Sequence, residues 1–329
     1  MTEFSIIEKY FKPLTNDNIA ARNLADDVAK ISLKKNEELV VSKDMFVEGV
    51  HFLAGDGGFK IASKLLRTNL SDLAAAGAKP LYYSLGFTKN KNCDKKFLKD
   101  FCRGLQEVQN EFGLCLIGGD TVSSQEMFFS ITIFGSIKKA KILSRNQAKD
   151  GDLIFVSGNI GDAALGLKIK LGEDFLNLKK LDKKEKNYLL QRHFFPIPRI
   201  TLGIKLLEKN LSNCAIDISD GLLADLRHIC KESQVDAEIY LEKIPFSSTV
   251  QKLSNSQKLD LLSGGDDYEL LFAIKPRDQN KLFDLAKSLK LNLSCIGNFK
   301  KPANTKSAIN LRDAKNKKIP IKKFGYEHF

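Results

Sequence analysis

Residues 112–121 read F-G-L-C-L-I-G-G-D-T, and this stretch shows how the first half of the chain is organised. Just before it, residues 96–112 carry apolar side chains at helical spacing, which predicts an amphipathic helix. The apolar run 114–117 predicts a buried strand, and the glycine pair after it predicts a tight turn that ends in Asp120. Another strand is predicted at 127–137. A helix, a strand, a turn and a strand in this order indicate a mixed α/β domain.

The same reading extends to both ends of the chain. Upstream, residues 38–43 and 81–87 predict strands, and residues 59–76 predict a helix. A link at 138–150 is followed by strands at 153–157, 214–218 and 268–274, and by helices at 162–171, 199–209, 221–232 and 277–289. Residues 173–186 are interpreted as a charged segment that leads to Pro196 and Pro198. We therefore expect two α/β domains with mixed sheets, at residues 1–140 and 141–329.

Length and composition agree with two ordinary globular domains. The chain has 329 residues, of which 43% are hydrophobic and 28% charged. No apolar run approaches the roughly 18 residues of a membrane span, and the N-terminus lacks the apolar core of a signal peptide. The six cysteines include no C-x-x-C pair and are expected to be reduced. These features predict a soluble, cytoplasmic protein without a membrane partner.

The net charge is +12, which by itself permits an anionic partner. The lysines lie in runs that alternate with acidic residues and asparagine, and no pattern of stacking aromatics accompanies them. We interpret them as a solvated surface and expect no nucleic-acid partner. A basic nucleic-acid binder is the alternative, and steep salt dependence on generic DNA or RNA would reveal it.

A series of aspartates at the ends of predicted elements is the main candidate for chemistry. Their positions are Asp26, Asp27, Asp44, Asp72, Asp120, Asp217, Asp220, Asp266 and Asp267. Short carboxylates on rigid turns suit Mg²⁺, which takes a few carboxylates together with water and phosphate oxygens. Each aspartate also has a plain structural alternative, since Asp220 fits a helix N-cap and the others fit solvated turns.

The pattern around Asp120 favours phosphate chemistry. Backbone N–H groups of the Gly118–Gly119 turn are able to face a phosphate beside Asp120, although an ordinary tight turn is the alternative. The Walker A, Rossmann and protein-kinase motifs are absent, as is a nucleophile motif. Arg145 is a candidate phosphate contact or a surface arginine. His51 follows Asp44 by seven residues and is a candidate pocket residue or a structural histidine. An acidic site without a nucleophile favours phosphoryl transfer.

Ten segments in order resemble the thiamine-monophosphate kinase family. They are EFSIIEKYF, ADDVA, VVSKDMFVEGVHF, NLSDLAAAGAKP, LIGGDT, SRNQAKDGD, FFPIPR, AIDISDGLLADL, LSGGDDYELLF and GYEHF, and they run from residue 3 to the last residue. The DISDGL and GGD motifs are shared with a wider superfamily that includes aminoimidazole-ribonucleotide synthetase. The NLSDLAAAGA, GVHF and GYEHF segments are the ones that point to the thiamine enzymes.

The resemblance implies ATP-dependent phosphorylation of thiamine monophosphate to thiamine diphosphate by direct in-line transfer. It implies a fold like that of aminoimidazole-ribonucleotide synthetase, with an N-terminal ATP- and metal-binding domain that pairs in a homodimer. The C-terminal domain would complete the ATP and substrate site. Several Mg²⁺ ions per site and ATP as phosphoryl donor are implied. The alternatives are another acceptor within the superfamily, tested by which substrate elicits ADP release, or a non-catalytic nucleotide-binding protein.

The resemblance also assigns site residues one by one. It implies metal ligands at Asp27, Ser42, Lys43, Asp44, Asp72, Asp120, Asp217 and Asp220. It implies ATP contacts at Gly119, Asp120, Arg145 and Ser219, and substrate contacts at His51 and Asp266. Of these, Asp120, Asp220 and Arg145 would be catalytic.

Three positions depart from the family pattern. Ala25 stands where glycine is common, and Asp266 stands where glutamate is frequent and reaches one methylene further. Lys43 stands where threonine is common, so it is expected either to ligate metal only through its backbone carbonyl or to replace some cationic charge. The tail aromatic that often covers the thiamine is not assigned among the residues near Phe324 and Tyr326.

Overall fold

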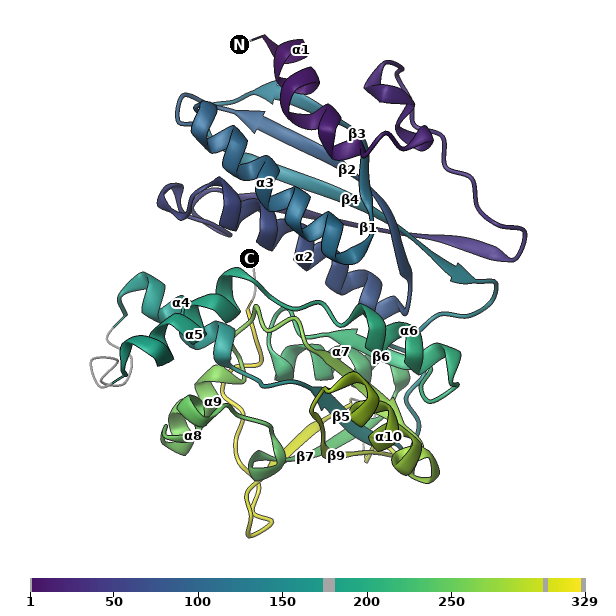
Figure 1. Cartoon of the computed structure of the whole chain (residues 1–329). Helices are drawn as coiled ribbons and strands as arrows, with labels where there is room; N and C mark the ends of the chain where they lie inside the picture. The colour runs from purple at the N-terminus through teal and green to yellow at the C-terminus, as the bar shows by residue number, and fades with distance from the viewer. Residues whose placement is uncertain (1, 174–180, 304–306, 327–329) are drawn as a thin grey trace. The chain divides into compact units, whose positions relative to one another are not determined.

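The computed structural model describes residues 2–173, 181–303 and 307–326, and the chain forms two compact units (Figure 1). The first unit comprises Met1–Leu73 and Ala78–Lys141, and the second comprises Ala74–Gly77 and Ile142–Phe329. Each unit contains its own mixed sheet, and this confirms the predicted mixed α/β class. Among the described residues, no helix is long and apolar enough to cross a membrane.

The sheet of the first unit has four strands in the order β1-β4-β2-β3. The strands are β1 (Glu37–Val47), β2 (Lys79–Lys89), β3 (Cys115–Ser123) and β4 (Phe128–Lys138). β2 and β3 are parallel, whereas β4 runs antiparallel to both β1 and β2. The order leaves β1 and β3 as the two edge strands, and they carry the predicted site residues Asp44 and Asp120.

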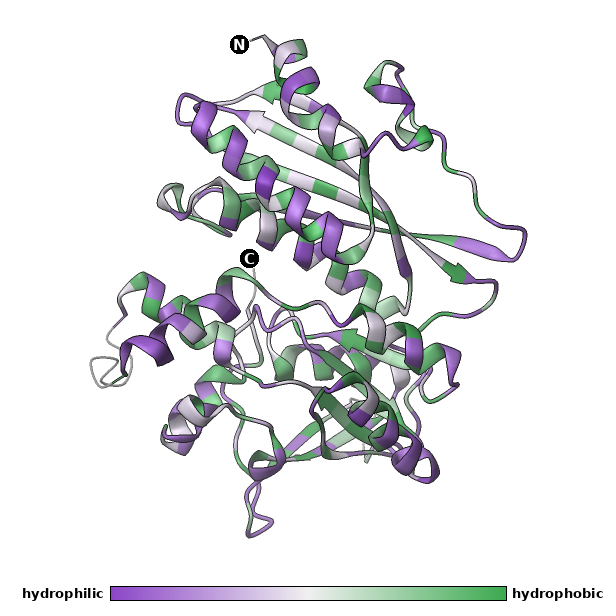
Figure 2. Cartoon of the chain, in the orientation of Figure 1, coloured by the Kyte–Doolittle hydropathy of each residue, from purple (hydrophilic) through white to green (hydrophobic). Residues whose placement is uncertain are grey.

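Two helices, α2 (Gly58–Ala76) and α3 (Lys95–Phe112), pack on one face of this sheet (Figure 1). Figure 2 shows hydrophobic and hydrophilic residues alternating around α3, as an amphipathic helix requires. The buried side of α3 places Phe101 with its ring centroid 4.8 Å from that of Phe129 on β4 and 5.2 Å from that of Phe87 on β2. Asp94 caps the start of the helix and Gly113 ends it in the left-handed region.

The other face of the sheet is only partly covered. The N-terminal segments are α1 (Glu3–Ile6), η1 (Ile7–Phe11), η2 (Lys12–Thr15) and η3 (Ile19–Leu24). Ala20 and Ala21 of η3 pack with Cys115 and Ile117 of β3. Along the opposite edge, alternate β1 side chains remain exposed: Leu39, Val41 and Met45 are 41%, 52% and 48% accessible. An apolar row therefore faces outward along β1.

The second unit is built on a six-stranded sheet in the order β10-β7-β9-β5-β8-β6. The strands are β5 (Leu153–Ser157), β6 (Cys214–Asp217), β7 (Asp236–Tyr240), β8 (Leu270–Ile274), β9 (Leu293–Lys300) and β10 (Ile309–Arg312). The helices are α4 (Asp162–Leu171), α5 (Lys183–Phe194), α6 (Ile200–Glu208), α7 (Leu222–Ser233), α8 (Ser248–Gln251), α9 (Asn255–Leu261) and α10 (Gln279–Leu289). β7 and β10 pair in parallel, and the other pairs are antiparallel.

Several elements of the second unit differ from the sequence prediction. Part of the supposed charged segment is helix α5, which has a capping box formed by Asp182 and Glu185. The apolar pattern of α5 is weak, but the D-x-x-E spacing of Asp182 and Glu185 is a sequence signal for the beginning of a helix. Strands β7, β9 and β10 were not predicted, and neither were the short helices α8 and α9. The missed strands are short or contain polar residues, so their pairing partners rather than their own composition define them.

A buried ion cluster ties the start of β8 to the segment around α5 and α6. The Glu269 carboxylate accepts hydrogen bonds from Arg199 Nε (2.6 Å) and Arg199 Nη2 (2.5 Å). It also accepts from Arg192 Nη2 (3.0 Å) and from Ser157 Oγ (2.6 Å). Four donors on one buried carboxylate fix the strand that follows the GGDDY segment.

The neighbouring Asp267 caps helix α4 from a distant part of the chain. Its carboxylate accepts hydrogen bonds from Gly161 N (2.7 Å) and Ala163 N (3.2 Å). Burial raises the pKa of Asp267 from 3.8 to about 8, even though the hydrogen bond from Gly161 acts in the opposite direction, and the charge of Asp162 raises it further. Asp267 and Glu269 thus hold in place the short segment that leads into β8.

Replacing Glu269 by alanine should destabilise the protein strongly. The Glu269→Ala change leaves two guanidinium groups beside a site without its carboxylate, which costs on the order of 3–5 kcal/mol for a broken buried pair. Urea denaturation measures the free energy of unfolding. Glu208→Ala is a matched control, because Glu208 pairs with Lys205 at the surface of α6, where loss of a pair costs about 1 kcal/mol or less. Equal losses of unfolding free energy in the two variants would contradict the stabilising role of the Glu269 ion cluster.

Asp267→Asn should flatten the dependence of stability on pH. Because the pKa of Asp267 is raised in the folded state, folding takes up a proton between about pH 4 and pH 8, and the free energy of unfolding falls as the pH rises through this window. Asparagine removes that contribution. Urea denaturation at several pH values from 5 to about 8 gives the slope, and exposed Asp284→Asn is the control. If Asp267→Asn leaves the slope of unfolding free energy against pH as in the wild-type protein, the raised pKa of Asp267 is refuted.

Candidate functional site

The first acidic pair lies at the β1 edge of the four-stranded sheet. Ser42 and Asp44 lie opposite Ile133 and Ile131 of β4, so their side chains are on the helix-covered face. There the Ser42 hydroxyl donates a hydrogen bond to Asp72 of α2 at 2.5 Å. The backbone N–H of Asp44 donates to Asn69 Oδ1, one helical turn before Asp72, at 3.1 Å. The structure thus brings three predicted metal-site residues together.

Electrostatics at this edge favour a bound cation. Burial raises the pKa of Asp44 from 3.8 to about 7, and the nearby charge of Asp72 raises it further, while a hydrogen bond from Thr68 acts in the opposite direction. A carboxylate held in this way is poorly solvated and sits next to a like charge. A divalent cation would relieve both effects, and carboxylate and hydroxyl oxygens are ligands that Mg²⁺ accepts. The donor set therefore fits the implied metal.

Lys43 lies on the opposite face of the same strand. It pairs with Thr132 in the β1–β4 ladder, and its ammonium donates hydrogen bonds to Ser130 Oγ (3.3 Å) and Thr132 Oγ1 (3.4 Å). The alternation of strand residues therefore separates the Lys43 side chain from Ser42 and Asp44. A metal contact through the Lys43 carbonyl stays a prediction.

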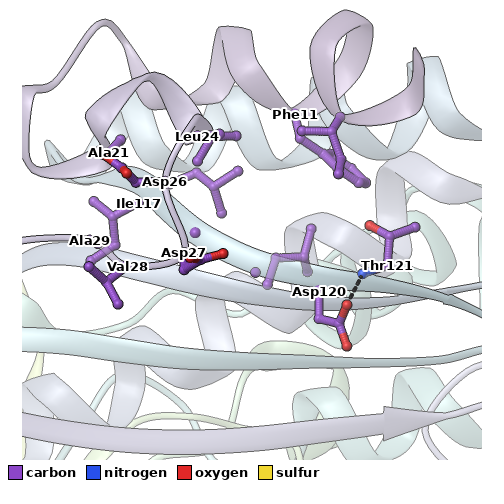
Figure 3. A pocket seen from close by; sticks show the side chains of 15 residues that line it. Phe11, Ala21, Leu24, Asp26, Asp27, Val28, Ala29, Ile117, Asp120 and Thr121 are labelled. Atoms are coloured by element: carbon purple, nitrogen blue, oxygen red, sulfur yellow. Dashed lines mark hydrogen bonds between the residues drawn. The ribbon is translucent and has the colours of Figure 1, made fainter. Parts of the chain in front are cut away.

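The second acidic pair lines a pocket beside β3, the other edge of the sheet (Figure 3). Asp27 and Asp120 both contribute to its wall, together with Gly118 and Gly119. Asp120 Oδ1 accepts a hydrogen bond from the N–H of Thr121 at 2.8 Å. A side chain at position 119 would bring its Cβ within 2.1 Å of the Leu85 carbonyl oxygen, so the close approach of β2 and β3 requires glycine.

The turn that carries Asp27 accommodates the Ala25 departure. Ala25 has φ −102° and ψ −5°, which any L-residue adopts without strain. The left-handed residues are the three before it, Arg22, Asn23 and Leu24, with φ between 49° and 57°. Arg22 also forms an ion pair with Asp26, at 2.5 Å. The turn therefore directs Asp26 to Arg22 and does not need glycine at position 25.

His51 lies in the turn that follows β1. Its Nδ1 accepts a hydrogen bond from the N–H of Val47 at 3.2 Å, so a neutral ring carries its proton on Nε2. The ring stacks on Phe46, with the centroids 5.3 Å apart. These two contacts orient the ring, and the predicted substrate contact of His51 stays a prediction.

A third acidic group lies in the second unit, after β6. Asp217 ends this strand, and the backbone N–H of Asp220 donates to Asp225 Oδ2 at 3.1 Å. Burial raises the pKa of Asp225 from 3.8 to about 8, and the charges of Asp217 and Asp220 add to the effect. Arg145 acts in the opposite direction, so its guanidinium lies within electrostatic reach of this group. The structure brings Asp217, Asp220 and Arg145 together.

Asp225 was not among the predicted site residues. It lies in the first turn of α7, five residues after Asp220, and is buried. The sequence signal was the second aspartate in the ISDGLLADL segment, whose position on the first helical turn suits a contact with the preceding loop. Nearby, burial and then the charge of Arg145 lower the pKa of His228 from 6.5, so this ring stays neutral near pH 7.

Ser219 and Asp266 are joined by their backbones. The N–H of Asp266 donates to the Ser219 carbonyl at 2.9 Å, and the N–H of Tyr268 donates to Ile218 at 2.8 Å. A Cβ at Gly265 would lie 2.2 Å from the Ser219 oxygen, so only glycine permits this approach. Asp266 Oδ2 lies 3.3 Å from Nδ1 of the buried His193. Ser219, a predicted ATP contact, and Asp266, a predicted substrate contact, are therefore held side by side.

The C-terminal tail is fastened to the same loops. Tyr326 N–H donates to the Asp220 carbonyl at 3.0 Å, and Ser263 Oγ donates to the Lys323 carbonyl at 2.6 Å. Phe324 packs against the core of the second unit, with Arg227 lying 4.6 Å from its ring centroid. Tyr326 is 48% exposed. Of the two tail aromatics within the described residues, Tyr326 is the more open to a ligand.

The acidic side chains of the described residues do not form a complete metal cage. Among residues 2–173, 181–303 and 307–326, no three or more histidine, cysteine, aspartate or glutamate side chains are grouped so as to hold one ion. The carboxylates instead occur as small groups at the β1 edge, the β3 edge and the β6–α7 loop. Such groups suit Mg²⁺ sites in which water and phosphate oxygens supply the remaining ligands.

Two family models together match most of the chain. The family model "AIR synthase related protein, N-terminal domain" matches residues 25–137, and the corresponding C-terminal domain model matches residues 149–309. Hydrogenase maturation protein HypE in complex with ATP has the same fold, with a TM-score of 0.79 at 19% identity, covering 100% of this chain and 96% of that one.

Relatives that match over the full length of the chain define its family more narrowly. Thiamine-monophosphate kinase of Buchnera aphidicola subsp. Schizaphis graminum is 40% identical, over 99% of this chain and 98% of its own. The Escherichia coli K12 enzyme is 36% identical over the same shares. The structure of AaThiL complexed with AMPPCP and TMP superposes with a TM-score of 0.76 at 26% identity, covering 99% of this chain and 97% of that one. The chain belongs to the thiamine-monophosphate kinase family.

Proposed function

We propose that this chain transfers the γ-phosphoryl group of ATP directly to the phosphate of thiamine monophosphate, giving thiamine diphosphate and ADP. The observation that carries the proposal is 36–40% identity with thiamine-monophosphate kinases over the full length of the chain. The acidic groups at the β1 edge, in the pocket beside β3 and after β6 support it. The AaThiL complex, which contains AMPPCP and TMP, supports the same pair of substrates. Such a reaction belongs to the biosynthesis of thiamine diphosphate.

Magnesium would be held by the acidic groups. Asp44, Asp72 and Ser42 would bind it at the β1 edge, Asp27 and Asp120 at the β3 edge, and Asp217 and Asp220 in the second unit. When bound, Mg²⁺ neutralises phosphate charge and holds the donor and acceptor phosphates in line. The raised pKa of Asp44 supports this assignment, because the pair is costly without a counter-ion.

The remaining site residues would position and neutralise the substrates. The Gly119 backbone and Ser219 would contact the nucleotide, and Arg145 would bind a phosphate by its guanidinium. His51 and Asp266 would contact the thiamine substrate, and exposed Tyr326 would cover it. The attacking oxygen belongs to a phosphate that is already anionic at neutral pH. A strong general base is therefore unnecessary, and positioning and charge neutralisation dominate the catalysis.

We infer that two copies pair through the first unit. The β1 and β3 acidic groups lie at opposite edges of one sheet, three strand spacings or about 14 Å apart. One ion cannot bridge that separation. The exposed apolar row Leu39, Val41 and Met45 lies on the uncovered sheet face, as an interface requires. We propose a two-fold arrangement that sets the β1 edge of one copy beside the β3 edge of the other.

The pocket beside β3 supports the pairing. It encloses about 140 Å³, which is less than the roughly 300 Å³ or more of a typical site for a drug-sized ligand. A second copy would add the missing wall.

We also propose a cytoplasmic location. All six cysteines are free, and burial raises the pKa of the Cys102 thiol to about 12, so it resists oxidation.

Thiamine diphosphate formation from ATP, Mg²⁺ and thiamine monophosphate tests the proposed reaction, with Asp120→Asn as the site variant. We expect stoichiometric thiamine diphosphate and ADP from the wild-type protein. Loss of a metal-binding carboxylate should lower turnover by about two orders of magnitude or more while leaving the melting temperature nearly unchanged, because Asp120 is exposed. Asp284→Asn is the surface control. Full turnover in Asp120→Asn would refute the metal role.

A further inference from the structure

Lys43 carries a positive charge that the described residues do not neutralise. Its ammonium bonds to the hydroxyls of Ser130 and Thr132, at 3.3 and 3.4 Å. Among the described residues, no carboxylate lies within ion-pair distance of its Nζ. An ammonium has three N–H donors, and two neutral hydroxyls occupy two of them. The charge and the third donor are thus available to an anion.

The strand register places this ammonium on the same sheet face as Asp120. Ser130 of β4 lies opposite Gly86 of β2, and Gly86 lies opposite Asp120 of β3. Directly paired residues share a face, so Ser130 and Asp120 stand in one row with only a glycine between them. Ser130 bends over that glycine, because a Cβ on Gly86 would lie 2.5 Å from Ser130 Oγ. Ser130, whose hydroxyl accepts a hydrogen bond from Lys43, therefore lies in the same row across the sheet as Asp120.

We propose that Lys43 is a phosphate-binding residue whose ammonium contacts the phosphate oxygens of the nucleotide bound at Asp120. The inference rests on the proposed function and deepens it. Ser130 and Thr132 hold the side chain extended along the uncovered face, so its charge is fixed before the nucleotide arrives.

The chemistry of lysine at this position differs from that of threonine, the residue that the resemblance leads us to expect here. A threonine oxygen has lone pairs and is able to ligate a metal, whereas an ammonium has none. Lys43 would instead supply a permanent charge directly to phosphate, as a charge-assisted hydrogen bond. Nucleotide binding in this chain should therefore depend less on the Mg²⁺ concentration than it does once threonine is restored.

Isothermal titration with β,γ-methylene-ATP, from trace to saturating MgCl₂, tests the proposal without turnover. Lys43→Met should raise the Kd at low MgCl₂ roughly tenfold or more, the usual worth of a hydrogen bond between charged groups. Lys43→Arg should keep most of the affinity. Lys43→Thr should move half-maximal binding to higher MgCl₂. Lys79→Met, at an exposed position of the same sheet, is the control.

Equal Kd values for Lys43→Met and Lys79→Met at every MgCl₂ concentration would overturn the proposal. Melting temperatures identify a variant that fails to fold, and Lys43→Gln, which keeps the length and polarity of the side chain, replaces Lys43→Met in that case. Thiamine diphosphate formation by the wild-type protein is measured in parallel. If the wild-type protein binds the analogue but makes no thiamine diphosphate, the proposed acceptor fails while the Lys43 comparison still stands.

Discussion

The width of the four-stranded sheet governs how this chain is able to assemble a phosphoryl-transfer site. The order β1-β4-β2-β3 sends the Asp44 and Asp72 carboxylates to one edge and the Asp120 carboxylate to the other. Aspartate is too short to span the about 14 Å between these edges. Neither edge alone collects enough ligands for a cation, so each depends on a nucleotide, on water and, in the proposed pairing, on a second copy.

The second unit meets a different requirement, which is to hold two polar loops close together. Backbone hydrogen bonds join Ser219 to Asp266 and Ile218 to Tyr268, and Glu269 ties the end of this segment to Arg192 and Arg199. The buried carboxylates of Asp267 and Glu269 have several donors each, which keep them in one position. Side chains that contact a substrate gain from such rigidity, because their geometry is set before the substrate binds.

Much of this was predictable from sequence because its signals are local. The helix α3 and the strand start at Cys115 each depend on nearby residues. The tight turn predicted at Gly118–Gly119 was wrong, because both glycines and Asp120 lie within β3, where pairing with β2 continues the strand. The distribution of Asp44 and Asp120 over opposite edges was not predictable, because strand order depends on pairing between distant segments. Strands β7, β9 and β10 were missed for the same reason. Asp225 was missed although it belongs to the ISDGLLADL segment, because its burial beside Asp217 and Asp220 becomes visible only in the folded chain.

The most direct measurement of the shared-site arrangement is the activity of a mixed dimer. Asp44→Asn and Asp120→Asn chains with different tags would be co-expressed, and the dimer carrying both tags isolated by two affinity steps. If each site combines the β1 edge of one copy with the β3 edge of the other, one of the two sites in this dimer is intact. Its turnover should then be about half that of the wild-type dimer, although both single-variant proteins are inactive. An inactive mixed dimer would contradict the arrangement, because it would place Asp44 and Asp120 in the same site of one chain.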